Sequence, residues 1–128
     1  MKVRLAVALF LVLGFSYSFG IYQSADPDQL QMEQLAKAGI DMAKPQEIAF
    51  TLHFADAHNE TKACVSIFEK KFDVESARPE KADEKWTCIA RKTMLPELKV
   101  LSKIRKDFEA IAAKNKGSYD GWNIQQRK

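Results

Sequence analysis

Alternating apolar and polar residues along the chain predict the strands of a sheet. Residues 48–54 place large apolar side chains at every second position, the period that is typical of a strand buried on one side. Residues 72–76 and 86–91 alternate in the same way and are separated by a charged, proline-containing segment, so they predict a hairpin. The aromatic-rich residues 119–124 predict a fourth strand.

Apolar residues with helical spacing predict helices before and between these strands. Asp26 is of a type that caps helix N-termini, Pro27 suits the first turn, and Gly39 suits the C-terminal end. A second helix is predicted from about residue 60 to 71. Four of its residues fall on one face, which we expect to lie on the sheet: Cys64, Ile67, Phe68 and Lys71.

The longest helical pattern starts at Pro96, and Gly117 is expected to end it. Its apolar stripe consists of Leu98, Leu101, Ile104, Phe108, Ile111 and Ala112. The predicted order is therefore a helix followed by β-α-β-β-α-β. This order is typical of an α+β, ferredoxin-like fold, in which a four-stranded antiparallel sheet carries two helices on one face, here preceded by a short N-terminal helix.

The N-terminus has the pattern of a secretion signal. Lys2 and Arg4 precede an uninterrupted apolar run, and the small residues Ser18 and Gly20 suit the positions before a cleavage point. We therefore expect a signal peptide over residues 1–20. The rest then divides into a linker with a short helix over 21–44 and the α+β domain over 45–128.

Two alternatives remain for this leader. If the apolar segment extends through Tyr22, it approaches the lower limit of about 17 residues for a membrane-spanning helix and would be an uncleaved anchor. It could also be a buried helix of the core. Because the positive charges precede the apolar run, both export hypotheses place the domain outside the cytoplasm. The sequence thus predicts a periplasmic or secreted protein, or a membrane-anchored one with its domain outside.

The charge of the chain gives no sign of a nucleic-acid partner. The whole sequence has 20 basic and 17 acidic residues, and removal of residues 1–20 leaves 18 and 17, a net charge of +1. The charges alternate in sign along most of the chain, whereas nucleic-acid binders carry a clustered basic face. We expect no direct binding to nucleic acid, and contact with a membrane only through an uncleaved leader.

Cys64 and Cys88 are the two cysteines of the chain. Thiols of an exported protein can be oxidised, and an even number allows one intramolecular bridge. In the predicted topology the first helix after residues 48–54 crosses the third strand, so both residues lie on faces that meet. The alternative is two buried free thiols that act as small apolar residues.

The residue types of a metal site occur in one short stretch. His53, Asp56 and His58 are potential ligands, with Glu60 nearby, but their spacing matches no established ligand motif. The cysteines have no neighbouring base in the sequence that would favour catalysis. We therefore predict no cofactor and no enzymatic activity, and keep a small metal-binding protein that uses these residues as an alternative.

Short motifs in a fixed order along the mature chain carry a family resemblance, and the most specific of them is residues 117–122. The positions that carry it are Gly39, Asp41, Pro45, Phe54, Trp86, Pro96, Gly117, Tyr119, Asp120, Gly121 and Trp122. The chain resembles the domain of the ribonuclease E inhibitor RraB, also called regulator of ribonuclease activity B. It departs from that family in its leader, and at Phe50 and Ala55, where the family tends to have histidine and proline.

The resemblance implies a ferredoxin-like fold and a regulator that acts by protein contact, because relatives dock on ribonuclease E and lower its cutting of RNA. That enzyme works in the cytoplasm, so an exported domain would not meet it. We expect a protein partner in the cell envelope. If the leader is not a signal, the alternative is a cytoplasmic-type inhibitor of ribonuclease E.

The face of the sheet opposite the helices is the predicted partner surface. It should present Ala49, Thr51, His53, Thr87, Ile89 and Arg91. Sheets of this topology commonly bind through that face, which is an argument from fold analogy. The alternative is an ordinary solvated surface.

Overall fold

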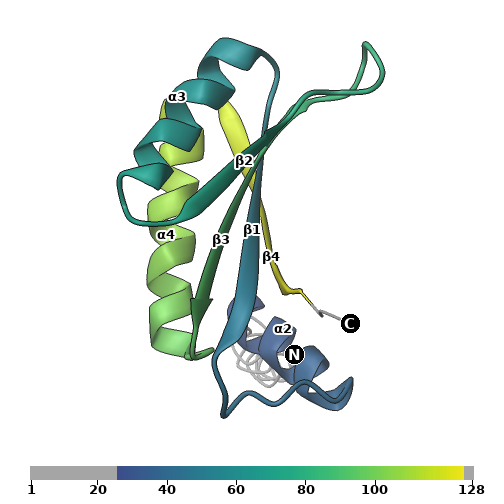
Figure 1. Ribbon diagram of the computed structural model, residues 1–128, viewed down its shortest axis with the longest axis vertical. Helices are drawn as coiled ribbons and strands as arrows, with labels where there is room; N and C mark the ends of the chain where they lie inside the picture. The colour runs from purple at the N-terminus through teal and green to yellow at the C-terminus, as the bar shows by residue number, and fades with distance from the viewer. Residues whose placement is uncertain (1–25, 126–128) are drawn as a thin grey trace, which may run out of the picture.

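The computed structural model describes residues 26–125, in which three helices and four strands follow one another as helix, β-α-β-β-α-β (Figure 1). Their bounds are Pro27–Lys37 for α2, Gln46–Phe54 for β1, Ala57–Phe68 for α3, Asp73–Ala77 for β2, Trp86–Met94 for β3, Leu98–Lys114 for α4 and Gly117–Ile124 for β4. The predicted leader lies outside the described residues. Within residues 26–125, none of the helices is long and apolar enough to cross a membrane.

The four strands form one antiparallel sheet in the order β2-β3-β1-β4. The central pair, β1 and β3, stays in register over its whole length, from Gln46 opposite Met94 to Phe54 opposite Trp86. This strand order and the two crossing helices confirm the predicted α+β, ferredoxin-like fold.

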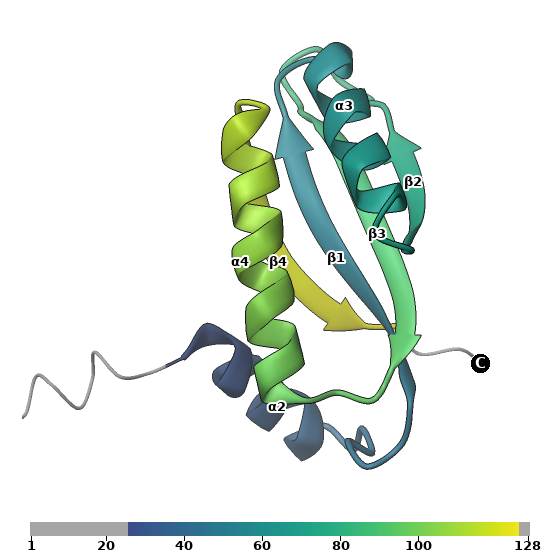
Figure 2. The ribbon, with the colours of Figure 1, turned by 90° about the vertical axis from the view of Figure 1, so that its left-hand side faces the viewer.

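Helices α3 and α4 lie side by side on one face of the sheet, as Figure 2 shows from the helical side. The core fills the space between them and the inward-facing residues of β1. Three aromatic rings, from Phe50 on β1, Phe72 just before β2 and Phe108 on α4, meet edge to face with centroids 5.1–5.7 Å apart. Phe50 and Phe108 are fully buried, so the core lies under this one face of the sheet.

The buried face of α3 differs from the predicted one. The helix starts at Ala57 because the Asp56 side chain accepts the backbone N–H of Asn59, and it presents Glu60, Ala63, Cys64 and Ile67 to the sheet. Phe68 lies about 100° further round the helix from Ile67 and is 60 % exposed. Lys71 lies beyond the helix, with a positive φ of 76°. The inclusion of Phe68 and Lys71 on the buried face was therefore wrong.

Gly117 does not end α4 as predicted and has a different role in the structure. The left-handed residue after the helix is Lys116, with φ of 60°, and Gly117 is already the first residue of β4. A Cβ on Gly117 would collide with the ring of Phe54 and lie 2.5 Å from the His53 carbonyl oxygen. Gly117 is thus required for close packing of β4 on β1, and the helix ends without it.

Candidate functional site

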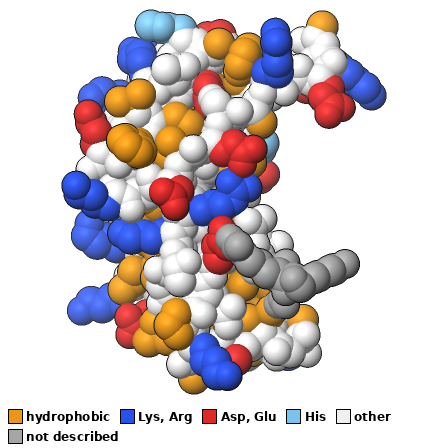
Figure 3. All heavy atoms as spheres, viewed as in Figure 1, with side chains coloured by type: hydrophobic (Ala, Val, Ile, Leu, Met, Phe, Trp, Pro, Cys, Tyr) orange, Lys and Arg blue, Asp and Glu red, His pale blue; other side chains and the backbone are white. Residues whose placement is uncertain are grey.

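The predicted partner surface forms one continuous face of the sheet. Thr51 pairs with Ile89 and His53 with Thr87 across β1 and β3, and all four, together with Arg91, are partly exposed. We call these five residues the open face. Ala49, also expected there, is 8 % exposed. In Figure 1 the β2–β3 hairpin projects beyond one end of this face while α2 lies at the other, and Figure 3 shows the molecule recessed beneath the hairpin.

Two hollows extend along the open face. The larger, of about 590 Å³, lies under the hairpin and is lined by His53, Ala77, Arg78, Pro79, Glu80, Glu84, Lys85 and Thr87. The second, of about 310 Å³, includes Thr51, Ile89 and Arg91 together with the end of β4. Charged side chains of both signs line both hollows, and the apolar Ile89 belongs to the lining of the second.

His53 links three strands on the open face. Its Nδ1 lies 3.1 Å from Thr87 Oγ1 on β3, and its Nε2 lies 3.1 Å from Asp120 Oδ2 on β4. The imidazole is 31 % exposed and the Asp120 carboxylate 66 % exposed. The ring is therefore held in one orientation at the mouth of the larger hollow.

Arg91 forms a second polar link across the same face. Its Nη1 donates to Glu75 Oε1 on β2 at 2.7 Å, and its Nε donates to Gln125 Oε1 at 2.9 Å. These contacts span the sheet from one edge strand to the segment after the other. The guanidinium is consequently oriented across the face.

A β-bulge in β4 explains the spacing of the aromatic residues Tyr119 and Trp122 in the motif of residues 117–122, which we call the terminal motif. Tyr119 pairs with Leu52 and Trp122 with Phe50, so Asp120 and Gly121 together face Thr51 alone. Residues three apart point to opposite faces of a regular strand, whereas the bulge turns both aromatic residues toward the helices. Gly121 has φ of +93°, as expected for a glycine in this conformation.

Both aromatic residues of this motif pack into the protein. Trp122 is 7 % exposed, and its Nε1 donates to Asp28 Oδ1 at 2.9 Å. Tyr119 packs edge to face on Phe108, and burial raises the pKa of its hydroxyl above the ordinary value. The described residues offer no hydrogen-bond partner to that hydroxyl. Of the four motif residues 119–122, Asp120 is the one whose side chain reaches the open face.

The other motif residues occupy turns and packing positions. Gly39 has φ of +99° after α2, and Asp41 Oδ1 accepts the backbone N–H of Ala43. Pro45 directly precedes β1, and Phe54 is buried opposite the partly exposed Trp86. Pro96 is buried two residues before α4. These positions build the scaffold and do not converge on a single site.

The structure does not bring the predicted metal ligands together. His53 contacts Thr87 and Asp120, whereas Asp56 caps α3 and His58 is exposed on the first turn of that helix. The hydrogen bond from the Asn59 backbone lowers the pKa of Asp56 below its ordinary value. Asp56 therefore has a structural role.

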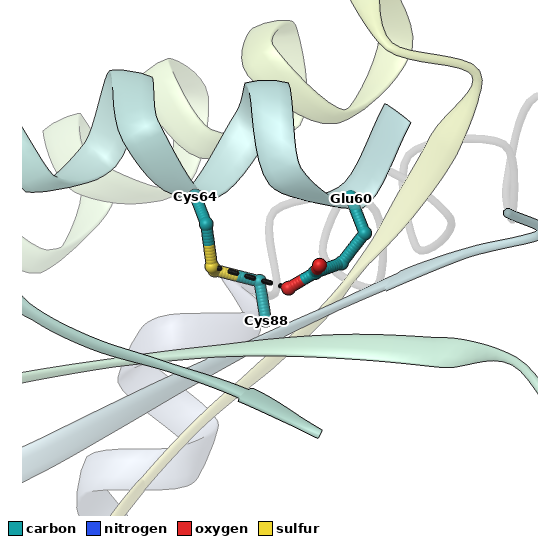
Figure 4. A group of neighbouring side chains, drawn as sticks. All are labelled: Glu60, Cys64 and Cys88. Carbon is teal, nitrogen blue, oxygen red and sulfur yellow. Dashed lines mark hydrogen bonds between the residues drawn. A yellow bond between two sulfur atoms is a disulfide. The ribbon is translucent and has the colours of Figure 1, made fainter. Parts of the chain in front are cut away.

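A different group of potential ligands lies under α3. Cys64 and Cys88 are joined by a disulfide with Cα atoms 5.8 Å apart, and the Glu60 carboxylate lies beside them (Figure 4). Within residues 26–125, these three side chains form the one set of three or more potential metal ligands that gathers within 4.8 Å. Glu60 is 1 % exposed. The sequence contained a signal for this group, since Glu60 and Cys64 are four residues apart on one helix.

Comparison with known proteins gives one finding for this architecture. A family model described as regulator of ribonuclease activity B matches residues 26–124, the range that runs from the cap of α2 to the last residue of β4. No curated protein matches the chain. The matched range contains the whole open face and the complete terminal motif.

Proposed function

The chain belongs to the family of regulators of ribonuclease activity B, and from this premise we propose that it is a non-enzymatic regulatory module that acts by binding a protein partner. The observation that carries this proposal is the extent of the match, which covers the described fold from α2 through β4. Family members of this kind regulate another protein's activity. The domain is therefore expected to present a surface that contacts a partner protein.

The side chains that carry reactive groups support a role without catalysis. The two cysteines are joined to each other and buried beneath α3. His53 is held between Thr87 and Asp120 on a shallow, open surface, which would not exclude water from a reaction. A preorganised polar surface of this type suits recognition.

The open face is the surface that we assign to the partner. Its centre is apolar, its rim carries oriented polar groups, and no described element covers it. The hairpin overhangs one end, so a partner segment would contact His53 and Thr87 beneath it. An inhibitor of this kind would block its partner by covering the part of the partner's surface that contacts the open face.

We further place this regulator outside the cytoplasm, with an envelope protein as its partner. The pattern of residues 1–20 supports export. The Cys64–Cys88 disulfide supports it independently, because such bonds persist in oxidising compartments and are rare in the cytosol.

A cytoplasmic regulator of ribonuclease E is the second candidate, and the description of the matched family favours it. A fusion of residues 1–30 to a reporter that is active only outside the cytoplasm distinguishes the two. Reporter activity is the expected result. An inactive reporter, together with direct binding of the purified chain to ribonuclease E, would establish the second candidate in place of the first.

Partner capture with matched variants tests the binding surface. The tagged chain is used to isolate proteins from an envelope fraction, and the same isolation is repeated with Ile89→Arg on the open face and Val100→Arg on α4, where Val100 is 40 % exposed. One protein should be retained by wild type and Val100→Arg and lost with Ile89→Arg. Equal retention by both variants would remove the open face from the proposal, provided that both fold.

A further inference from the structure

The Glu60 carboxylate next to the disulfide is not fully satisfied by its surroundings. Its Oε2 accepts a hydrogen bond from Ser76 Oγ and lies 3.3 Å from Cys64 Sγ. The sulfur of a disulfide carries no proton, so it cannot donate to the carboxylate. Glu60 Oε1 is buried and has no hydrogen-bond partner among the described residues.

Glu60 also lacks a cationic partner. None of the ion pairs within residues 26–125 includes this carboxylate, although its residue is 1 % exposed. Buried carboxylates are normally paired with a cation, coordinate a metal or hold a proton, because the loss of hydration is otherwise uncompensated. One oxygen of the group, Oε1, is therefore unused, while the other, Oε2, lies beside the disulfide (Figure 4).

We propose that Glu60, Cys64 and Cys88 form a redox-gated site for a thiophilic divalent cation such as Zn²⁺. The reduced protein holds the ion through two thiolates and one carboxylate oxygen, and the disulfide is the metal-free, oxidised form. This ligand set matches the preference of zinc for cysteine sulfur with a carboxylate or imidazole. The proposal is independent of the identity of any protein partner.

The exchange between the two forms is balanced by a thiol reductant. Two R–SH molecules reduce the Cys64–Cys88 bond to two thiols and leave as R–S–S–R. Binding of the cation then displaces two protons from the thiols to solvent, because the thiolates are the ligands. In the reverse exchange R–S–S–R takes two electrons from the thiolates and, with two protons from solvent, leaves as two R–SH; the Cys64–Cys88 bond forms again, both sulfur ligands are lost and the ion is released.

The observed geometry requires little movement of two of the three ligands. Zinc bonds of about 2.3 Å to sulfur and about 2.1 Å to oxygen, at a tetrahedral angle, place those two atoms roughly 3.6 Å apart. Glu60 Oε2 and Cys64 Sγ are 3.3 Å apart before any ion is bound. Both come from consecutive turns of α3, so the helix itself sets their spacing. Once the disulfide is reduced, Cys88 Sγ is free to move away from Cys64 Sγ and to act as the third ligand.

Ser76 connects this buried group to solvent. It belongs to the edge strand β2, is itself exposed, and reaches the Glu60 carboxylate with its hydroxyl. The carboxylate thus lies one side chain away from the exposed edge of the sheet. The Ser76 hydroxyl or a water molecule at the same place would supply the fourth ligand.

Cobalt binding to the reduced protein tests the proposal. The purified chain is reduced with a phosphine, desalted without oxygen and titrated with Co²⁺, whose thiolate complexes absorb in the near ultraviolet and whose tetrahedral sites absorb in the visible. We expect one equivalent to bind, Zn²⁺ to displace it, and the oxidised chain to bind none. Failure of the reduced protein to develop these bands would overturn the proposal.

Glutamate variants separate a built site from two adventitious thiols. Glu60→Gln keeps the size of the side chain and both thiols, and should weaken Co²⁺ binding at least tenfold. Glu69→Gln, at the exposed end of the same helix, should leave the affinity unchanged. Circular dichroism and a thiol count accompany each titration. Equal affinity of Glu60→Gln and wild type would mean that the thiols alone bind the ion, and would refute the three-ligand site.

Discussion

The indole N–H of Trp122 donates to Asp28 Oδ1 at 2.9 Å and joins residues 94 positions apart in the sequence. The other oxygen, Asp28 Oδ2, accepts from Arg105 Nε at 2.8 Å and from Ser102 Oγ at 3.2 Å. The carboxylate is 3 % exposed. This one side chain therefore joins α2 to both α4 and β4.

Replacement of Asp28 should destabilise the fold by removing three hydrogen bonds at once. Asp28→Ala leaves the Trp122 N–H unpaired and the Arg105 guanidinium without its main partner, the contact that raises the pKa of Arg105. Because Arg105 is partly hydrated, we expect a loss of about 2 kcal/mol in the free energy of unfolding. Urea denaturation should show a lower midpoint with an unchanged slope.

Glu109→Ala is the matched control for Asp28→Ala. Glu109 contacts the same guanidinium at 3.7 Å but is 52 % exposed, so its loss should change the free energy of unfolding by less than about 0.5 kcal/mol. Equal effects of the two substitutions would show that the burial of Asp28 does not determine how much its hydrogen bonds contribute to the free energy of unfolding.

The disulfide should account for a large part of the stability of so small a domain. Cys64 and Cys88 are 24 residues apart, and closing a loop of this length contributes about 3 kcal/mol, mainly by restricting the unfolded chain. Reduction without added metal should lower the free energy of unfolding by that amount. In a Cys64→Ala, Cys88→Ala double variant, reductant should have no effect, and any remaining sensitivity would have to come from another source.

The sequence predicted the elements of the fold because their patterns are local. Alternation over residues 48–54, the apolar stripe of α4 and the Asp26 and Pro27 start signal each lie within one element, and all appear in the structure. The resemblance to the RraB family is confirmed by the family match. The face of α3 was harder to predict, because Phe68 is as apolar as Ile67 and only tertiary packing decides which of them is buried.

The contacts of the candidate site could not be predicted in the same way. The bulge at Asp120 and Gly121 depends on how β4 registers with β1, and periodicity cannot reveal a two-for-one pairing. The burial of Glu60 was missed because a carboxylate on a helix is normally solvated. The open face was predictable, since alternation alone determines which side of a strand a residue occupies.

The cap of α3 should make stability depend on pH in the acidic range. The pKa of Asp56 is lowered in the folded state, chiefly by the hydrogen bond from the Asn59 backbone. Its contribution is therefore fully present above the ordinary value of 3.8 and is lost as the pH falls through the lower, folded-state value. Asp56→Asn retains a cap that does not ionise, so the stability difference from wild type should shrink as the pH falls from 5 to 3.

Asp56→Ala separates the cap from its charge. This variant should be less stable than both wild type and Asp56→Asn at neutral pH, because the Asn59 N–H loses its acceptor. Thermal unfolding at a series of pH values measures all three proteins. A constant difference between wild type and Asp56→Asn over the whole series would contradict the assigned cause of the pKa shift.

Replacing either glycine of β4 by alanine should destabilise the fold, for a different physical reason at each position. Gly117→Ala forces a methyl group against the Phe54 ring, and such overpacking typically costs about 1–3 kcal/mol. Gly121→Ala meets no atom within 4 Å but must hold φ near +93°, which costs about 1–2 kcal/mol. Phe54→Leu should therefore reduce the penalty at Gly117 in a double-mutant cycle and leave that at Gly121 unchanged.

Asp120 offers the sharpest separation of binding from stability on the open face. Its carboxylate is 66 % exposed and meets His53 at the rim of the larger hollow, whereas its neighbours Tyr119 and Trp122 pack into the protein. Because an exposed pair of this kind contributes about 0.5 kcal/mol, Asp120→Ala should leave the unfolding midpoint nearly unchanged.

The same substitution should weaken capture of the partner severalfold, since it releases the His53 ring from its orientation beneath the hairpin. Trp122→Phe provides the opposite control: it removes the hydrogen bond to Asp28, lowers stability, and leaves the side chains of the open face in place. Unfolding curves and partner capture are measured on both variants. If binding follows stability in the two proteins, the open face does not recognise the partner and the terminal motif serves the scaffold alone.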